Sequence, residues 1–323
     1  MNVKLLSIVI PTYNRASFLD QSLNILAPQI VKYKNQIEFA ISDNASTDNT
    51  EEVVRKYSEA IDIIYFRNKN NIGFERNFEK LLDNTSSKYV YLMGDDDIVA
   101  PDFLDNVISI LESVDDLGLV HWNRLSGNGE CKNNVIVDKD YDEQVWTGTP
   151  SDFIFKIMDN ATFISSIIFN RECWKLGSAY VGDKYLGFEW FSRLYWGALL
   201  LNKPCSYYYF PLVLQRNPSK TWAMFWPQYL ISSLSEIFLE LDRCVPNIYE
   251  KWSNKLRVEV PKYLHIVAYH RDYYRQKSIR KRLIRHLNRK ERFNFYCYLF
   301  IPGSLFIHRI KNKVASKAIK YLS

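Results

Sequence analysis

Three adjacent aspartates, Asp95, Asp96 and Asp97, are the side chains of this 323-residue chain with the clearest potential for chemistry. They follow the apolar run Tyr89–Met93 and Gly94, a pattern typical of a buried strand that ends in a turn. Adjacent carboxylates repel one another and stay ionised when water solvates them or when a cation lies among them. Hard cations such as Mg²⁺ and Mn²⁺ prefer oxygen ligands and keep open positions for substrate phosphates. The pattern therefore allows two interpretations, a metal–diphosphate site and a solvated acidic turn.

The segments that must position these carboxylates alternate between strands and helices. We expect strands at Ser7–Ile10, Ile37–Ile41 and Ile61–Phe66, and helices from Ser17 to Val31, from Asp48 or Thr50 through Tyr57, and from Phe74 to Leu82. Such alternation indicates βαβ units, and hence a mostly parallel sheet with helices on both faces. Pro11 should end the first strand, because proline donates no hydrogen bond to a ladder.

Polar turns follow three of the predicted strands, at residues 11–15, 42–48 and 95–97. Because these strands run in the same direction, their carboxyl ends meet at one edge of the sheet, where ligands of open α/β sheets bind. This convergence favours the metal–diphosphate interpretation. It predicts a nucleotide-and-metal cleft at that edge.

The same turns resemble the motifs of glycosyltransferase family 2, whose members are nucleotide-sugar-dependent enzymes of the GT-A fold. The segments that carry the resemblance are Pro11–Arg15, Ser42–Asp48, Asn71–Gly73 with Arg76–Asn77, and Asp95–Asp97. They fall within residues 5–105, and the likeness beyond that stretch is weak. Within the family the chain looks most similar to bacterial O-antigen and capsule sugar transferases, including abequosyltransferase-like ones. The resemblance implies an α/β, GT-A catalytic domain at residues 1–222.

The resemblance also implies a set of nucleotide-binding residues. They are Pro11, Thr12, Tyr13, Arg15, Asp43, Arg76, Asp95 and Asp96. The ring of Tyr13 offers a stacking face, and the carboxylate of Asp43 suits the single imide donor of uracil. Structural roles stay open for each residue, such as loop packing for Tyr13, an Asx turn or helix cap for Asp43, and a solvated helix position for Arg76.

In the acidic triplet, the family pattern places one carboxylate on the ribose and the last one on a divalent cation, Mn²⁺ or Mg²⁺. Asp95 and Asp97 fit this DxD pattern, and Asp97 is our first choice as metal ligand. Arg216 and Lys220 follow an aromatic, β-like run, in the region where family members often have a loop that closes on the diphosphate. They are the expected diphosphate partners, with a solvated basic loop as the alternative.

Family members also have an acidic general base at the start of a helix, often as Glu-Asp. We expect this role for Glu189, with Asp183 as the second choice, although Trp190 stands where the usual aspartate would be. The base would deprotonate an acceptor hydroxyl while its oxygen attacks the anomeric carbon. A helix N-terminal carboxylate, favoured by the helix dipole, is the alternative role of Glu189.

The composition is that of a folded chain without an extracellular disulfide framework. The chain is 47% hydrophobic and 15% aromatic, so a sizeable core is expected. Its five cysteines are widely spaced and include no Cys-x-x-Cys pair, which fits reduced thiols. The N-terminal apolar run Leu5–Ile10 is too short for a signal peptide, and no stretch free of charge reaches transmembrane length. We therefore expect a cytoplasmic location.

Positive charge is concentrated at the C-terminal end. Residues 271–323 carry 15 Lys and Arg against 2 Asp and Glu, whereas the whole chain has a net charge of +6. The aromatic segment Phe293–Ile310 lies between the basic segments Gln276–Arg292 and Lys311–Lys320, as in an interfacial membrane anchor. We expect residues 223–323 to be helical and to bind an anionic membrane surface on the inner face of the bacterial plasma membrane, with no nucleic-acid partner. Packing of these helices on the catalytic domain is one alternative. A tail that binds nucleic acid is another, which the aromatic content and the Pro302-Gly303 break disfavour.

These features predict an inverting, metal-dependent glycosyltransferase that moves a sugar from a nucleotide-sugar donor, preferably a UDP-sugar, to a lipid-linked oligosaccharide in O-antigen or capsule biosynthesis. The alternative is a non-catalytic sugar- or lipid-binding scaffold that keeps the GT-A fold, which the Glu189-Trp190 pair leaves open. Nucleotidyl or phosphoryl transfer is disfavoured because the chain has no Gly-rich phosphate loop. The sequence does not identify the sugar, the acceptor, the linkage or the oligomeric state.

Overall fold

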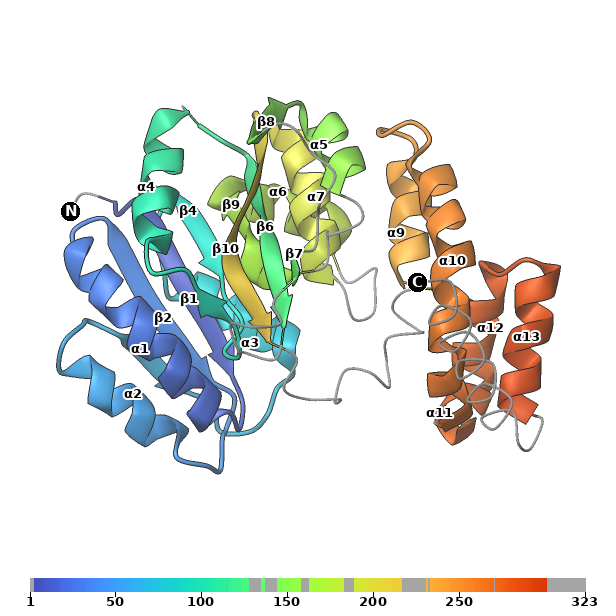
Figure 1. Cartoon of the computed structure of the whole chain (residues 1–323), viewed down its shortest axis with the longest axis horizontal. Coiled ribbons are helices and arrows are strands. Elements are labelled where there is room, and N and C mark those ends of the chain that lie inside the picture. The colour runs from blue at the N-terminus through green and yellow to red at the C-terminus, as the bar shows by residue number, and fades with distance from the viewer. Residues whose placement is uncertain are drawn as a thin grey trace, which may run out of the picture. The chain divides into compact units, whose positions relative to one another are not determined.

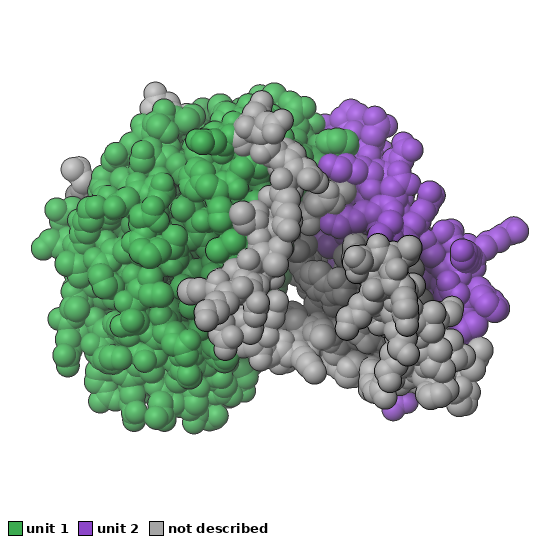
Figure 2. Space-filling view, in the orientation of Figure 1, with its two compact units in different colours: residues 1–184, 189–218 green, residues 185–188, 219–323 purple. Residues whose placement is uncertain are grey.

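The chain forms two compact units, residues 1–184 with 189–218 and residues 185–188 with 219–323 (Figure 2). The computed structural model describes residues 3–114, 116–127, 135–136, 144–157, 163–182, 189–216, 231, 233–269 and 271–300. Within these residues the first unit contains a sheet flanked by helices, and the second unit consists of helices (Figure 1). The functional division predicted at residue 222 stays a prediction.

The first unit begins with strands and helices in alternation. Their order is β1 (Leu6–Thr12), α1 (Ala16–Lys32), β2 (Ile37–Asp43), α2 (Thr50–Ser58), β3 (Ile64–Arg67), α3 (Phe74–Asp83) and β4 (Tyr89–Leu92). β1 pairs in parallel with both β2 and β4, and β2 pairs in parallel with β3. The carboxyl ends of these four strands therefore lie at one edge of the sheet. This confirms the predicted α/β class.

The rest of the first unit turns the sheet into a mixed one. Its elements are β5 (Ile98–Val99), α4 (Phe103–Ser113), β6 (Leu119–Gly127), β7 (Val135–Ile136), β8 (Val145–Gly148), α5 (Pro150–Ile157), the 3₁₀ turn η2 (Ile164–Ser166), β9 (Ile167–Asn170), α6 (Arg171–Val181), α7 (Glu189–Leu201) and β10 (Cys205–Arg216). The described strands follow the order β3-β2-β1-β4-β9-β6-β10-β5, with β7 on β6 and β8 on β10. β9 is antiparallel to both of its neighbours.

One predicted loop is in part a piece of this sheet. The sequence predicts a loop or hairpin over the cleft at residues 127–149. The described residues of that segment form β7, which is antiparallel to β6, and β8, which is antiparallel to β10. β6 and β7 follow one another in the chain and pair as in a hairpin, which agrees with the hairpin alternative. The predicted position over the cleft stays a prediction.

Alternate side chains of the central strands enter two different cores. On one face, Ile8, Ile10 and Phe39 belong to a buried apolar cluster with residues of α1, α2 and α4. On the other face, the ring of Phe78 in α3 makes edge contacts with Phe169 of β9 at 6.3 Å and with an α6 tryptophan at 5.0 Å. Burial on both faces explains why the strands read as continuous apolar runs.

β1 continues through Pro11, which was expected to end it. The carbonyl of Val9 accepts a hydrogen bond from Met93 N at 3.0 Å, and the carbonyl of Thr12 accepts one from Asn44 N at 2.9 Å. Successive residues of a strand direct their backbone N–H and C=O groups to opposite neighbouring strands. The nitrogen of Pro11 therefore points to the same side as the carbonyl of Val9, toward β4, where the pairing of β1 with β4 has already ended. The missing N–H therefore leaves no ladder bond unformed. The extended strand carries Thr12 to the acidic turn.

Glycines fix the helix that begins at Glu189. A Cβ added at Gly177 of α6 would lie 1.7 Å from the carbonyl oxygen of Arg193, and one at Gly197 of α7 would lie 1.7 Å from that of Cys173. The two helices approach this closely only because both contact points lack a side chain. α7 is therefore held in a fixed position on α6.

The second unit has a core of its own. Its described helices are α9 (Leu234–Leu241), α10 (Ile248–Tyr269), α11 (Arg271–Arg275), α12 (Lys277–Arg285) and α13 (Arg289–Phe300). Trp252 donates a hydrogen bond to Ser235 Oγ at 2.9 Å, and its ring lies 4.9 Å from that of Phe238. Within the described part of the chain, no helix is both long and apolar enough to cross a membrane. The predicted basic segment 311–320 lies outside the described residues.

Candidate active site

The turn Gly94–Asp97 connects β4 to β5 and holds its carboxylates away from bulk water. Asp95 is 7% exposed and Asp97 is 3% exposed. Gly94 has no room for a side chain, because an added Cβ would lie 2.9 Å from a carboxylate oxygen of Asp97 and 3.2 Å from Oγ of Ser165. Carboxylates buried to this extent exclude a fully solvated acidic turn.

Asp95 faces the end of β1. Its Oδ2 accepts a hydrogen bond from Oγ1 of Thr12 at 2.8 Å, and its Oδ1 lies 3.3 Å from Nη1 of Arg15. Burial raises the pKa of Asp95 to about 6, although the charge of Arg15 opposes the change. The structure thus brings the first and last polar turns into contact, as their convergence predicts.

Asp97 faces other partners. Its Oδ2 accepts a hydrogen bond from Oγ of Ser165 at 2.6 Å, and its Oδ1 accepts one from the backbone N–H of Arg216 at 3.2 Å. Burial, and after it the charge of Asp96, raises the pKa of Asp97 to about 8. Raised pKa values at two positions of one turn indicate that burial penalises the ionised carboxylates more than their hydrogen bonds and ion pairs stabilise them.

Asp96 forms an ion pair with Arg15, whose Nη1 also lies near Asp95. The side chains of Arg15 and Asp96 are each 20% exposed. Burial acts to lower the pKa of Arg15, but the charges of the two aspartates outweigh it and the pKa is raised. One guanidinium therefore serves two carboxylates of the turn.

The chemistry of these donors fits a divalent cation. Carboxylate oxygens are the ligands that Mg²⁺ and Mn²⁺ prefer, and a cation would stabilise the ionised forms of Asp95 and Asp97. No three acidic, histidine or cysteine side chains among the described residues surround a common point, since Asp95 and Asp97 turn to different partners. A cation at the turn would therefore be held by one or two of its carboxylates and complete its coordination with ligand phosphates or water.

Two polar turns are locked to each other at the ends of β1 and β2. Asn14, with φ of 53°, accepts a hydrogen bond from Thr47 N at 2.7 Å and donates its own N–H to Ser46 Oγ at 2.9 Å. Asp48 accepts a hydrogen bond from Ala16 N at 2.9 Å. These bonds fix the backbone beside Tyr13, whose side chain is 43% exposed. A half-exposed ring on a rigid loop is suited to stacking on a planar ligand.

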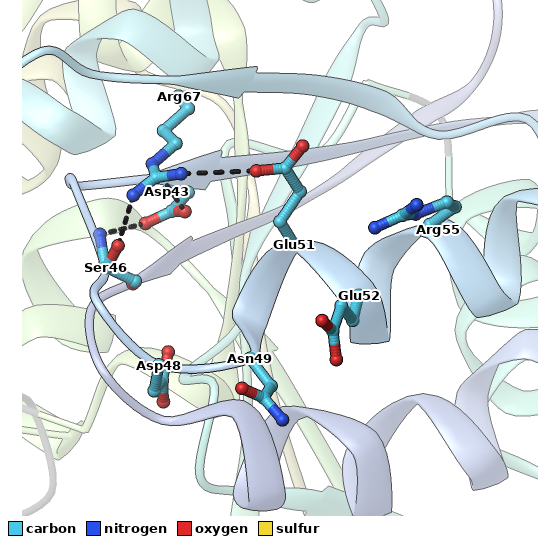
Figure 3. Close-up of a pocket in the computed structure, with 8 residues that line it drawn as sticks. All are labelled: Asp43, Ser46, Asp48, Asn49, Glu51, Glu52, Arg55 and Arg67. Atoms are coloured by element: carbon cyan, nitrogen blue, oxygen red, sulfur yellow. Dashed lines mark hydrogen bonds and ion pairs between the residues drawn. The ribbon is translucent and has the colours of Figure 1, made fainter.

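Asp43 lies in a pocket of about 210 Å³ at the end of β2 (Figure 3). Its Oδ1 accepts from Ser46 N at 2.7 Å, its Oδ2 accepts from Tyr65 OH at 3.1 Å, and Nε of Arg67 lies 3.5 Å from Oδ2. Arg67 also pairs with Glu51 at 3.2 Å. The bond to Ser46, three residues on, is a local contact of side chain with backbone that stabilises the turn after β2. A carboxylate oxygen has two lone pairs, so Asp43 can accept a further donor from a ligand.

A set of asparagines shapes the loop that leads to Arg76. Asn44 Oδ1 accepts from Ile72 N at 2.9 Å and from Asn68 Nδ2 at 3.0 Å, and Asn68 also donates to Asn77 Oδ1 at 2.8 Å. Arg76 itself is exposed on the first turn of α3. The network fixes the start of α3 and leaves Arg76 accessible to a ligand.

Arg216 is buried behind the acidic turn. Its guanidinium donates to the carbonyl of Phe18 at 3.2 Å, to Gln21 Oε1 at 2.6 Å and to Ser22 Oγ at 3.2 Å. Its Nε donates to the carbonyl of Asp96. These contacts join the end of β10 to α1 and to the acidic turn. The diphosphate role of Arg216 stays a prediction, and it would require the side chain to change partners.

The remaining predicted residues are only partly described. Glu189 is the first residue of α7, but its side chain lies outside the described part of the structure. Asp183 and Lys220 lie outside the described residues altogether. Their predicted roles as general base and diphosphate partner stay predictions.

Sequence reasoning did not find Ser165, Ser22 or Arg67. Ser22 donates to the carbonyl of Asp97 at 2.6 Å, from a position on α1 that reads as an ordinary helix serine. Ser165 lies far along the chain in η2, with no motif around it. Arg67 had a usable signal, because it ends β3 at the same sheet edge as the recognised turns.

A comparison with protein families identifies the segment that carries this site. The model described as glycosyl transferase family 2 matches residues 7–166. Residues 7–166 form a glycosyltransferase family 2 domain. The matched segment contains the acidic turn, the Asp43 pocket and Ser165.

Curated relatives of this chain include bacterial sugar transferases. The abequosyltransferase of Salmonella typhimurium is 30% identical over 201 residues, which cover 56% of this chain and 58% of that protein. The GalNAc(5)-diNAcBac-PP-undecaprenol β-1,3-glucosyltransferase of Campylobacter jejuni is 29% identical over 151 residues, covering 42% of this chain and 47% of that protein. The chain therefore spans less than two thirds of the length of either relative.

Solved structures share the fold of this chain. TarS of Staphylococcus aureus, residues 1–349 in complex with UDP-GlcNAc, has a TM-score of 0.61 at 14% identity, over 91% of this chain and 90% of that one. A mannosyltransferase of Pyrobaculum calidifontis, in complex with GDP-Man and Mn²⁺, has a TM-score of 0.53 at 16% identity, over 97% of this chain and 88% of that one. At these identities the likeness concerns the fold alone, and it confirms the GT-A class.

Proposed function

We propose that this chain is an inverting, metal-dependent glycosyltransferase that moves a sugar from a nucleotide-sugar donor, preferably a UDP-sugar, to a saccharide acceptor of surface-polysaccharide biosynthesis. The proposal rests on one observation, that the ends of β1 and β2 and the acidic turn after β4 meet at one edge of the sheet. Thr12 contacts Asp95 at 2.8 Å and pairs in register with Asp43. The pocket and the acidic turn are thus neighbours across β1, in the order in which a nucleotide presents its base, ribose and phosphates.

The Asp43 pocket supports uracil as the base. Uracil presents an imide N–H between two carbonyl oxygens. Asp43 would accept the N–H, and Arg67, held beside it, would donate to a carbonyl. Both groups are hydrogen-bonded in place before a ligand arrives, so the wrong base would leave a buried polar group unpaired.

Other residues of the converging turns would hold the rest of the nucleotide. The exposed ring of Tyr13 would stack on the base or ribose. Pro11 and Thr12 would lie along the base and the ribose. Asp95 and Asp96 would accept bonds from the ribose hydroxyls. Arg76, accessible at the start of α3, would reach the base or the diphosphate. The last member of the turn, Asp97, is our first choice as ligand of Mn²⁺ or Mg²⁺, with Asp95 as the second.

In the transfer step, a bond forms between the acceptor oxygen and the anomeric carbon while the bond from that carbon to the diphosphate breaks. Glu189, at the start of the rigidly held α7, would take the proton of the acceptor hydroxyl, with Asp183 as the second candidate. A bound cation would stabilise the negative charge of the leaving diphosphate. Arg216 and Lys220 would add positive charge on the same group.

A lipid-linked oligosaccharide is the proposed acceptor, and the second unit is the proposed membrane contact. Lys277, Lys281 and Arg285 of α12 are exposed, and Phe293 of α13 is 69% exposed. Basic and aromatic side chains of this kind bind an anionic interface. Removal of residues 277–323 should release the protein from vesicles that contain anionic lipid. Unchanged co-sedimentation of the truncated chain would reject this contact and leave the catalytic proposal untouched.

Nucleoside diphosphate release tests the catalytic proposal. The full chain, with Mn²⁺ present, should release nucleoside diphosphate from one of the UDP-, dTDP-, GDP- or CDP-sugars, preferably a UDP-sugar. D97A should abolish the release, whereas K88Q should keep it, because Lys88 lies at the opposite end of β4. A scaffold that only binds sugar or lipid would release nothing from any donor.

A further inference from the structure

Arg15 already contacts two of the three carboxylates in the turn that would bind a divalent cation. Its Nη1 lies 3.3 Å from Oδ1 of Asp95 and is paired with Oδ2 of Asp96. A guanidinium in this position already supplies positive charge to the turn that would bind a divalent cation. A divalent cation held by Asp97 and Asp95 would share the Asp95 carboxylate with this guanidinium, and two cations so close together repel each other strongly.

We propose that Arg15 occupies the acidic turn as an internal cation, and that a divalent cation binds there only when Arg15 moves away from Asp95 and Asp96. The inference rests on the proposed function, because it assigns a regulatory role within that same site. Arg15 would then be a positioning residue, because its movement would free the carboxylates to bind a divalent cation.

The local structure confines any movement to the side chain of Arg15. Its backbone is fixed on one side by Asn14, which is bonded to Ser46 and Thr47, and on the other by Ala16, whose N–H donates to Asp48. The side chain is long and 20% exposed, so it has a path to solvent. The pair with Asp96 can therefore break without a change in β1 or α1.

A nucleoside diphosphate offers Arg15 a better partner than solvent does. Guanidinium groups bind phosphate oxygens through two parallel hydrogen bonds. A nucleotide whose base lies in the Asp43 pocket would bring its phosphates toward the acidic turn, so Arg15 could move from Asp96 to phosphate. Cation and nucleotide would then strengthen each other's binding, because each favours the displaced position of Arg15.

Mn²⁺ alone is the probe for the first experiment. Free Mn²⁺ is measured by electron paramagnetic resonance during titration of the full chain without nucleotide. R15Q should bind Mn²⁺ roughly tenfold more tightly than the unaltered protein, since the competing charge is gone. R15K, which keeps the charge, should stay close to the unaltered protein. K88Q, which removes one positive charge from the other end of β4, should not change the affinity. Equal Mn²⁺ affinity of R15Q and the unaltered protein would overturn the inference.

A second measurement keeps the inference testable if R15Q does not fold. In the unaltered, ¹⁵N-labelled protein, the Nε–H signal of Arg15 should shift when Mg²⁺ is added. Saturating Mg²⁺ that leaves this signal in place would overturn the inference.

A third titration separates failure of the inference from failure of the proposed function. UDP should strengthen Mn²⁺ binding by a larger factor in the unaltered protein than in R15Q. If UDP strengthens it equally in both, the inference fails and the proposed function survives. If neither protein binds Mn²⁺ or UDP, both fail.

Discussion

The Asp43 pocket and the Asp95–Asp97 turn are two acidic sites at one edge of the same sheet, and they differ in how their charge is balanced. Asp43 is 1% exposed and is surrounded by donors, including Ser46 N at 2.7 Å and Tyr65 OH at 3.1 Å. In the acidic turn, burial raises the pKa of Asp95 to about 6 and that of Asp97 to about 8. The carboxylate of Asp43 is satisfied by donors before a ligand arrives, whereas the turn holds three carboxylates against the two guanidinium groups of Arg15 and Arg216.

This difference matches what the two halves of a nucleotide donor require. A base is neutral and is recognised by donors and acceptors that hold fixed positions, which costs little reorganisation when they are already bonded. A diphosphate with its cation brings net charge, and a turn with unbalanced carboxylates gains most from that charge. The contrast predicts that substitutions in the turn affect catalysis, and that substitutions in the pocket affect donor choice.

The largest effect is expected for Asp97. D97N should lower transfer by about 10³-fold or more, because it removes a negative charge from the proposed cation site. Its thermal unfolding midpoint should change little, because relief from one buried negative charge offsets the loss of one of the two acceptors that Asp97 provides to Ser165 and to the backbone N–H of Arg216. Calorimetry of the metal-free protein beside a transfer assay checks both parts. Full transfer by D97N would show that the turn is not the charged half of the site.

Asp43 should give a smaller and more selective effect. D43N should weaken UDP binding by about 10- to 100-fold, because the N3–H of uracil would lose its charged acceptor. Turnover at saturating donor should change less than affinity. Isothermal titration with UDP, and with CDP and GDP as matched ligands, measures the change. Equal losses for all three nucleotides would contradict the assignment of the pocket to the base.

Substitution of Ser165 tests whether the carboxylate of Asp97 depends on a hydrogen bond from a residue that is distant in the sequence. S165A removes the hydrogen bonds of Oγ to Asp97 at 2.6 Å and from Gly94 N at 2.8 Å. Transfer should fall by about tenfold, because one buried donor to the carboxylate is lost and its orientation is less fixed. The affinity of the Asp43 pocket for free uridine should stay unchanged. A loss of uridine binding as large as the loss of transfer would mean that the two sites are not separate.

Glu38 lies at the opposite end of the strands from the candidate site, so its carboxylate serves as a control with no proposed catalytic role. Its substitution should have the smallest effect of the four. Its carboxylate accepts hydrogen bonds from Ser7 Oγ, Ser87 Oγ and the N–H groups of Ser86 and Ser87. Although burial opposes the change, these bonds lower its pKa from 4.5 to about 2.

The stabilisation from Glu38 should therefore be fully present above pH 4.5 and should be lost as the pH falls through about 2. E38Q should be less stable than the unaltered protein by about 1 kcal/mol at pH 7. The difference should close toward pH 2, and thermal unfolding followed by circular dichroism at several pH values measures it. A constant difference across that range would contradict the assigned pKa.

The recognisable turns could be predicted from the sequence because each is a short, local pattern at the end of a strand. Thr12 and Asp95 lie in contact as that pattern requires. The partners that decide the state of the turn could not be predicted, since Ser165 and Arg216 reach Asp97 from distant elements through long-range packing. The end of β1 was predicted wrongly at Pro11 for a similar reason. Pairing with β4 ends at Val9, so the missing N–H of Pro11 costs no hydrogen bond, and the sequence does not show where that pairing ends.

The central claim is that one nucleotide links the two acidic sites. Crystals of the full chain with UDP and Mn²⁺, measured at the manganese absorption edge, test it most directly. The account predicts one anomalous peak within about 2.0–2.4 Å of a carboxylate oxygen of the Asp95–Asp97 turn and of a diphosphate oxygen, with uracil against Asp43. A peak away from the turn, or a uracil ring outside the Asp43 pocket, would contradict it.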